Sequence, residues 1–145
     1  MIRWLFVAAL VAPAVALGAT RTDVQKSYRA ALAQMPVAEQ SAQKSTASQD
    51  HFRTAVILLR ATESAFAKKD YRAAFGLAEQ AGTYARFTGK TLSLKELTAK
   101  YAPYVAAATR SVPAGKLLLG GKWKAYVSPD TIGFYAVAPR GPRLH

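Results

Sequence analysis

The chain has 145 residues, and its 20 Lys and Arg against 8 Asp and Glu give a formal net charge of +12. It contains no Cys, which excludes disulfides, thiolate nucleophiles, zinc–thiolate sites and iron–sulfur clusters. The apolar content of 51% is that of a globular chain, and a chain of this length buries enough surface to fold as one small domain.

Residues 1–19 have the features of a signal peptide. Arg3 supplies a positively charged start, an unbroken apolar run follows, and Pro13 comes directly after that run. Small residues then allow cleavage after Gly18 or after Ala19. Acylation by the bacterial lipoprotein route is excluded, because no Cys follows the run. We therefore expect export to the periplasm or the extracellular side of a bacterial envelope.

A retained membrane anchor is the competing interpretation of this segment, and a buried N-terminal helix is a third. The apolar stretch of residues 4–19 is shorter than the ~20 residues of a membrane-spanning helix, and Pro13 interrupts it. The sequence therefore favours a cleaved signal, which leaves a mature chain without a transmembrane span.

Residues 20–110 are predicted to form a helical domain. A capping box with Thr22 as the N-cap and a glutamine three residues later predicts the start of the first helix. From Val24 onward, apolar residues recur on one helical face, and Pro36 is predicted to end this helix or to begin the next one. The composition of residues 37–50 favours a helix, although a polar linker stays open.

The strongest pattern lies in the middle of the chain. Two apolar stripes at helical spacing are separated by the charged turn Lys68-Lys69-Asp70, in which Asp70 is the predicted N-cap of the second helix. So short a turn requires the two helices to lie antiparallel as an αα-hairpin. The stripes consist of Phe52, Ala55, Val56, Leu59 and Phe66, and then of Tyr71, Ala74, Phe75, Ala78, Ala81 and Ala85.

The second of these helices resembles part of a tetratricopeptide unit. Asp70 and Tyr71 open a run of the form D-Y-x-x-A-x-x-x-A-x-x-A, which is common in the turn and second helix of that unit. Residues 52–88 are also similar to exported helical-hairpin domains of bacterial envelope proteins. The ~34-residue period of a repeat array is missing, since Lys95 and Glu96 fall where Leu and Gly belong. The resemblance therefore implies a single interaction scaffold.

Two shorter helices are predicted to follow the hairpin. Ser93 and Glu96 form a capping box that opens the first of them, and Pro103 kinks or stops it. Residues 104–110 continue in helical pattern until Pro113. Four aromatic side chains at helical spacing are expected in the core rather than in a ligand groove. They are Tyr84, Phe87, Tyr101 and Tyr104.

Residues 111–145 are predicted to form a basic β-hairpin and a tail, packed on the same domain. Residues 122–127 and 132–138 alternate between apolar and other side chains, with turn chemistry between them, and residues 116–119 are a possible third strand. The predicted fold class is mainly α, an α+β arrangement of an antiparallel helical bundle with a central αα-hairpin and a small C-terminal β-hairpin. The hairpin face that should pack on the helices consists of Trp123, Ile132 and Phe134.

Three motifs suggest chemistry but do not meet its requirements. Residues 115–122 lack the spacing and the Ser or Thr of a phosphate loop. Ser41-x-x-Lys44 matches a penicillin-binding serine motif, but the remaining elements of that motif are missing. His51 is better explained beside a helix start than in acid–base chemistry. We therefore expect no catalytic site, no cofactor and no metal site.

The C-terminal hairpin is the densest basic region, and its outward side chains are the candidate contacts to an anionic partner. That partner would be lipid A and core sugars, anionic phospholipid or, less favoured, DNA. The alternative is that these side chains only solvate the sheet and protect its edge from aggregation. The candidate residues are Lys122, Lys124, Tyr126, Arg140 and Arg143.

Together these patterns predict an exported, non-enzymatic interaction protein whose basic surface contacts an anionic envelope component or a partner protein. One alternative is a structural subunit of a larger envelope assembly. An enzyme of unfamiliar type is a third, less favoured alternative.

Overall fold

The computed structural model describes residues 18–87, 90–115, 117 and 122–137. Within these residues the chain is mainly helical and ends in a two-stranded antiparallel hairpin, which confirms the predicted α+β class. Of the predicted signal segment, the described residues include only Gly18 and Ala19. The elements are helices α2 (Arg21–Ala42), α3 (Thr46–Ala67), α4 (Tyr71–Arg86), α5 (Leu94–Lys100) and α6 (Tyr104–Ser111), and strands β1 (Lys122–Val127) and β2 (Ile132–Val137).

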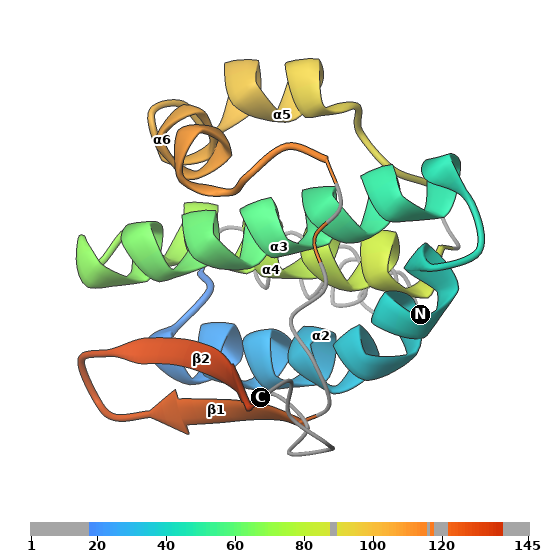
Figure 1. Ribbon diagram of the computed structural model, residues 1–145. Coiled ribbons are helices and arrows are strands. Elements are labelled where there is room, and N and C mark those ends of the chain that lie inside the picture. Colours follow the sequence, from blue (N-terminus) through green and yellow to red (C-terminus); the bar gives the residue numbers. More distant parts are fainter. Residues whose placement is uncertain (1–17, 88–89, 116, 118–121, 138–145) are drawn as a thin grey trace, which may run out of the picture.

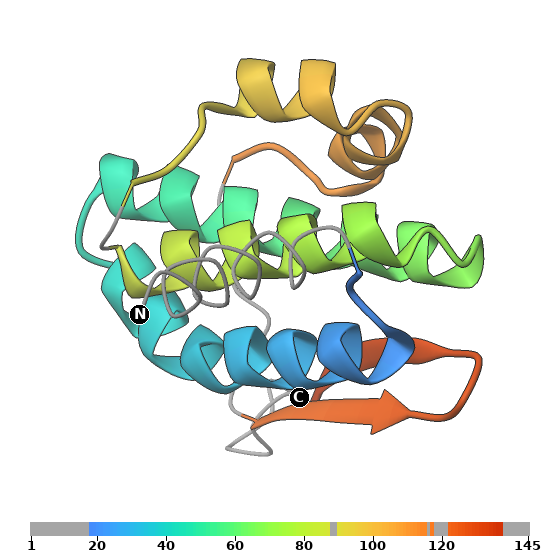
Figure 2. The same ribbon diagram turned by 180° about the vertical axis from the view of Figure 1, so that it is seen from behind.

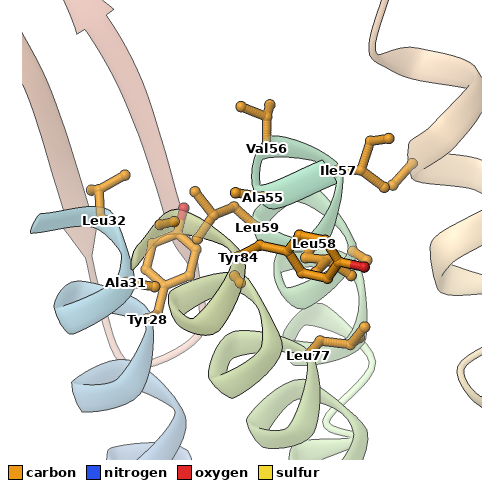
Figure 3. Close-up of a cluster of buried hydrophobic side chains, with 14 of the residues drawn as sticks. Tyr28, Ala31, Leu32, Ala55, Val56, Ile57, Leu58, Leu59, Leu77 and Tyr84 are labelled. Carbon is orange, nitrogen blue, oxygen red and sulfur yellow. The ribbon is translucent and has the colours of Figure 1, made fainter. Parts of the chain in front are cut away.

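The described elements lie in three layers. Helices α5 and α6 form one outer layer, α3 and α4 form the middle layer, and α2 lies with the β-hairpin on the other side (Figures 1 and 2). Figure 3 shows the core where the first three of the described helices meet, with Tyr28 from α2, Leu59 from α3 and Leu77 from α4. All three side chains are fully buried. None of the described helices is both long and apolar enough to cross a membrane.

Helix α2 begins earlier than predicted, so the assignment of Thr22 as its N-cap is wrong. The N-cap is Thr20, whose Oγ1 accepts a hydrogen bond from the Asp23 backbone N–H at 3.2 Å. The Asp23 carboxylate in turn accepts from the Thr20 N–H at 2.9 Å, which completes a capping box. The ionised Asp23 is a stronger acceptor than the neutral glutamine that Thr22 would use, and it adds a favourable charge at the helix N-terminus.

Pro36 lies inside α2, so the prediction that it ends one helix or begins the next is also wrong. A proline in a helix removes one backbone hydrogen bond, at a cost of about 3 kcal/mol. Beyond it, however, Ala38, Glu39 and Ala42 are all buried, and this packing keeps the chain helical through the proline. The helix favoured over residues 37–50 is confirmed, with one break at the turn where Ser45 caps α3.

The predicted αα-hairpin is present in α3 and α4. Asp70 is the N-cap of α4, and its Oδ1 accepts from the Ala73 backbone N–H at 3.2 Å, as expected. The turn before it requires a left-handed residue, which is Lys69 with a φ of 61°. Small buried residues of α4, including Ala74, Ala78 and Ala81, bring that helix close to its neighbours.

Helices α5 and α6 form in the predicted region; α6 packs on α3, and α5 packs on α6. The Ser93 and Glu96 capping box opens α5, and Pro103 separates it from α6 after a cis Ala102–Pro103 bond. Arg53 of α3 holds the end of α6, because its guanidinium donates to the carbonyl oxygen of Val112 at 2.8 Å. A cation at this end of a helix also favours the helix dipole.

The C-terminal hairpin has the predicted turn. Val127 pairs with Ile132, and the turn is closed by the Ser128 backbone N–H, which donates to the carbonyl oxygen of Thr131 at 2.8 Å. The possible third strand at residues 116–119 lies outside the described residues except for Leu117, which is buried and not part of a strand.

Candidate functional site

The inner face of the hairpin, formed by Trp123, Ile132 and Phe134, packs on the helices as predicted. The Trp123 ring stacks on the Phe134 ring with centroids 5.3 Å apart and meets the edge of Phe52 from α3 at 5.9 Å. Ile132 and Phe134 are each 3% exposed. This aromatic packing fixes the hairpin on α3 and therefore determines which side of each strand points away from the helices.

Two hydrogen bonds attach the hairpin to α2. The indole Nε1–H of Trp123 donates to Oε1 of the buried Glu39 at 2.9 Å. At the other end of the hairpin, Nε2 of Gln25 donates to the carbonyl oxygen of Ser128 at 2.9 Å. Because these contacts lie at opposite ends of the strands, the hairpin is held along its whole length.

A third attachment is made by an ionic cluster between α2, α3 and β2. The guanidinium of Arg60 lies 3.8 Å from the Phe134 ring centroid, and its Nη1 is 3.0 Å from both carboxylate oxygens of Glu63. The Tyr28 hydroxyl donates to Glu63 from the α2 side. Among the described residues, Arg60 and Glu63 form the one ion pair.

The protonation of this cluster is governed by burial. Removal from water raises the pKa of the Glu63 carboxyl above its ordinary value, although the hydrogen bonds from Tyr28 and the charge of Arg60 act in the opposite direction. Burial, followed by the nearby negative charge of Glu63, also raises the pKa of the Tyr28 hydroxyl. Neighbours within the fold occupy both Glu63 oxygens, so this cluster joins three elements rather than facing a substrate.

The outer face of the hairpin, which we define as Lys122, Lys124, Tyr126 and Tyr135, points away from the helices. All four side chains are exposed, and the two tyrosines are each 51% exposed. In the strand register Lys124 lies directly opposite Tyr135, while Tyr126 lies opposite Gly133. Since neither lysine has a carboxylate within 4.0 Å among the described residues, the face presents two free cations beside two aromatic rings.

Gly133 allows Tyr126 to lie across the neighbouring strand. A Cβ atom at Gly133 would be 2.2 Å from both Cζ and Oη of Tyr126, which is far inside van der Waals contact. The end of the ring therefore lies directly over the Gly133 backbone, while about half of the residue stays exposed. An aromatic ring covering a glycine on a sheet also stabilises the strand pair.

The structure brings three of the five predicted contact residues together. Lys122, Lys124 and Tyr126 share one face of the hairpin, as the alternation indicates. Arg140 and Arg143 lie outside the described residues. Tyr135 was missed by the sequence analysis, although the alternation that buries Ile132 and Phe134 already places it on the opposite side of the same strand.

The other motifs of the sequence have structural explanations where they are described. His51 lies within α3, with Nδ1 3.1 Å from the carbonyl oxygen of Ala47, and its ring packs against Tyr84 and Phe87. Ser41 lies at the end of α2, and Lys44 lies in the turn that follows it. The glycine-rich segment before β1 lies mostly outside the described residues. Among the residues that the structure describes, no group of three or more His, Asp or Glu side chains could hold a metal ion.

The four aromatic residues that were expected in the core divide into two groups. Tyr84 is buried as expected, and its hydroxyl donates to the carbonyl oxygen of Leu92. Phe87, Tyr101 and Tyr104 are only half-buried. All three pack against the core, and Tyr101 also lines a cleft between α4 and the end of α5.

No protein-family model, no curated protein and no solved structure matches this chain.

Proposed function

We propose that this protein is an exported, non-enzymatic interaction protein of a bacterial envelope, and that the outer face of its hairpin contacts an anionic envelope component. The observation that carries the proposal is the outer face itself. It combines two lysines without carboxylate partners among the described residues and two half-exposed tyrosines on a rigidly attached pair of strands.

Charge and aromatic surface support the same kind of partner. Free lysines attract phosphate or carboxylate groups, and the long-range field of a chain with net charge +12 adds to that attraction. The faces of the two exposed tyrosine rings carry partial negative charge, which favours contact with the C–H groups of a sugar ring. A phosphorylated sugar, such as that of lipid A, offers both features in one molecule.

The helices form the scaffold in this proposal. We take α2, α3 and α4 as an antiparallel bundle whose central αα-hairpin, similar to a single tetratricopeptide unit, holds the binding face in place. The proposed export depends on residues 1–19, whose composition is that of a cleaved signal peptide.

The test is binding of the chain without residues 1–19 to lipopolysaccharide vesicles at about 50 and about 200 mM salt. The charge-reversed variant Lys122→Glu/Lys124→Glu is compared with Lys90→Glu/Lys95→Glu, which changes the net charge equally at exposed positions outside the hairpin. We expect a loss of at least about tenfold in affinity for the hairpin variant and a much smaller loss for the control. Equal losses in the two variants would mean that net charge alone attracts the vesicles, and would contradict the proposed face.

A second measurement addresses export directly. The full chain is expressed in a bacterium, and the mass of the protein recovered from the periplasm is determined. Removal of residues 1–18 or 1–19 is the expected result. Recovery of the intact chain from the cytosol or the membrane would contradict the exported assignment without affecting the binding result.

A further inference from the structure

The described residues contain a cleft on the other side of the molecule from the hairpin. It lies between the first half of α4 and the end of α5 and has a volume of about 500 Å³, within the range of small-ligand sites. Figure 2 shows α4 below the layer of α5 and α6. The lining residues are Asp70, Arg72, Ala73, Phe75, Gly76, Glu79, Lys100 and Tyr101.

The carboxylates of the cleft are already engaged within the fold. Asp70 accepts the Ala73 backbone N–H with Oδ1 and the Tyr104 hydroxyl with Oδ2, at 3.2 and 3.0 Å. Glu79 accepts the Ser27 hydroxyl from α2. These hydrogen bonds cap α4 and connect neighbouring helices, and both carboxylates keep their negative charge.

The cations of the cleft are free by comparison. Arg72 and Lys100 are exposed, and neither has a carboxylate within 4.0 Å among the described residues. The Lys100 ammonium lies 5.5 Å from the ring centroid of Tyr101. Lys68 and Lys69, both exposed in the turn just before Asp70, add positive charge near the start of α4. Counted with these two lysines, the cations around the cleft outnumber its two carboxylates, so the local field favours an anion.

The walls between these cations are apolar and closely fitted. Phe75 is half-buried on α4, and the Tyr101 ring lies against the same helix at Gly76. A Cβ at Gly76 would be 2.2 Å from the Tyr101 hydroxyl oxygen, so the glycine is what allows this ring to reach the helix. An aromatic or alkyl group entering the cleft would lie against these two rings.

From these observations we propose that the cleft binds a small organic anion, a carboxylate attached to an aromatic or short alkyl body. The carboxylate contacts Arg72 and Lys100, and the apolar body lies against Phe75 and Tyr101. This site shares no residue with the outer face of the hairpin. Its binding is therefore independent of the proposed envelope contact, and either proposal can fail alone.

The experiment uses two probes of nearly the same shape and opposite charge, phenylacetate and phenethylamine. Each is titrated into the 15N-labelled chain while the backbone amide signals of Gly76 and Tyr101 are followed by NMR. We expect saturable shifts with phenylacetate, with a Kd of about 1 mM for a ligand of this size, and no saturable shifts with phenethylamine. Saturable binding of the ammonium probe, or no saturable binding of either probe, would overturn the proposal.

Two variants locate the contact. Arg72→Gln/Lys100→Gln is expected to weaken phenylacetate binding at least about fivefold, whereas Lys90→Gln/Lys95→Gln, with the same loss of charge elsewhere, should leave it unchanged. Gly76→Ala is expected to displace Tyr101 and weaken binding while keeping the helical circular dichroism signal. Equal affinity in the wild type and in the Arg72→Gln/Lys100→Gln variant would show that phenylacetate does not use these cations, and would contradict the site.

Discussion

The inner and outer faces of the β-hairpin come from the same two strands but differ in burial, in charge and in their contacts with the helices. On the inner face Ile132 and Phe134 are buried, the half-buried Trp123 stacks on Phe134, and the Trp123 indole donates a hydrogen bond to Glu39 of α2. The outer face is exposed and carries two lysines without carboxylate partners among the described residues. Because alternate residues of one strand belong to opposite faces, substitutions on the inner face should change stability, whereas substitutions on the outer face should change the proposed binding.

The largest loss of stability is expected from Phe134→Ala. The change removes a buried ring that stacks on Trp123 and lies 3.8 Å from the Arg60 guanidinium. Large-to-small changes of this kind cost about 3 to 4 kcal/mol in free energy of unfolding. Urea denaturation followed by circular dichroism measures the loss. A loss below about 1 kcal/mol would mean that the hairpin is not part of the cooperative fold.

Glu63→Gln is expected to have the next largest effect. The change removes the negative charge beside Arg60 but keeps an oxygen that can accept from the Tyr28 hydroxyl. The amide NH₂ replaces one of the two oxygens that accept from Arg60, but burial already disfavours the ionised carboxylate, so we expect a loss of only about 1 to 1.5 kcal/mol in the free energy of unfolding at neutral pH. Asp50→Asn, at an exposed position on α3, is a control for loss of a negative charge and should be nearly silent.

The same variant tests the direction of the Glu63 pKa shift. Since burial raises this pKa in the folded state, the folded protein holds the Glu63 proton more tightly than the unfolded chain does. The Glu63 contribution is therefore most favourable in acid and decreases as the pH rises from about 4.5 through the raised folded value. The wild-type minus Glu63→Gln difference in unfolding free energy should fall over that window. A difference that rises with pH would mean that Arg60 lowers the pKa.

Thr20→Ala should cost about 1 kcal/mol, because it removes the hydroxyl that caps the first described helix. Thr22→Ala, two residues later at an exposed site, is the matched control and should change stability by less than about 0.3 kcal/mol. Thermal unfolding of both variants compares the two positions. A larger loss of stability for Thr22→Ala than for Thr20→Ala would mean that Thr22 is the N-cap, as the sequence alone predicts.

The smallest effect on stability is expected on the outer face. Tyr126→Ser/Tyr135→Ser removes two half-exposed rings, one of which covers Gly133, and should cost no more than about 1 kcal/mol in total. Its effect should appear in binding instead. A loss comparable to that of Phe134→Ala would mean that the two faces are not separable.

The features that the sequence predicts correctly depend on interactions between residues that are close in the chain. The caps at Asp70 and Ser93 and the alternation of the hairpin strands depend on residues within a few positions of one another, so they can be recognised without the fold. The assignment of Thr22 as the N-cap is wrong because two overlapping capping patterns occur within a few residues. The choice between them depends on the stronger acceptor, Asp23.

Contacts between distant residues explain the remaining errors. Helix α2 continues past Pro36 because residues beyond the proline are buried against other elements, which the local sequence does not reveal. The bond between Glu39 and Trp123 and the contact of Arg60 with Phe134 likewise join residues far apart in the chain. The residues of the outer face follow from alternation alone, but its orientation depends on these distant contacts.

The proposed contact of the outer face with an anionic envelope component depends on its tyrosines as well as on its charge. The most direct measurement is binding of wild type and of Tyr126→Ser/Tyr135→Ser to lipopolysaccharide vesicles at about 200 mM salt, where non-specific attraction is screened. We predict that the variant keeps its fold and net charge but binds at least about fivefold more weakly. Equal affinity of the folded variant and the wild type would contradict the account, since the tyrosines would then contribute nothing to recognition.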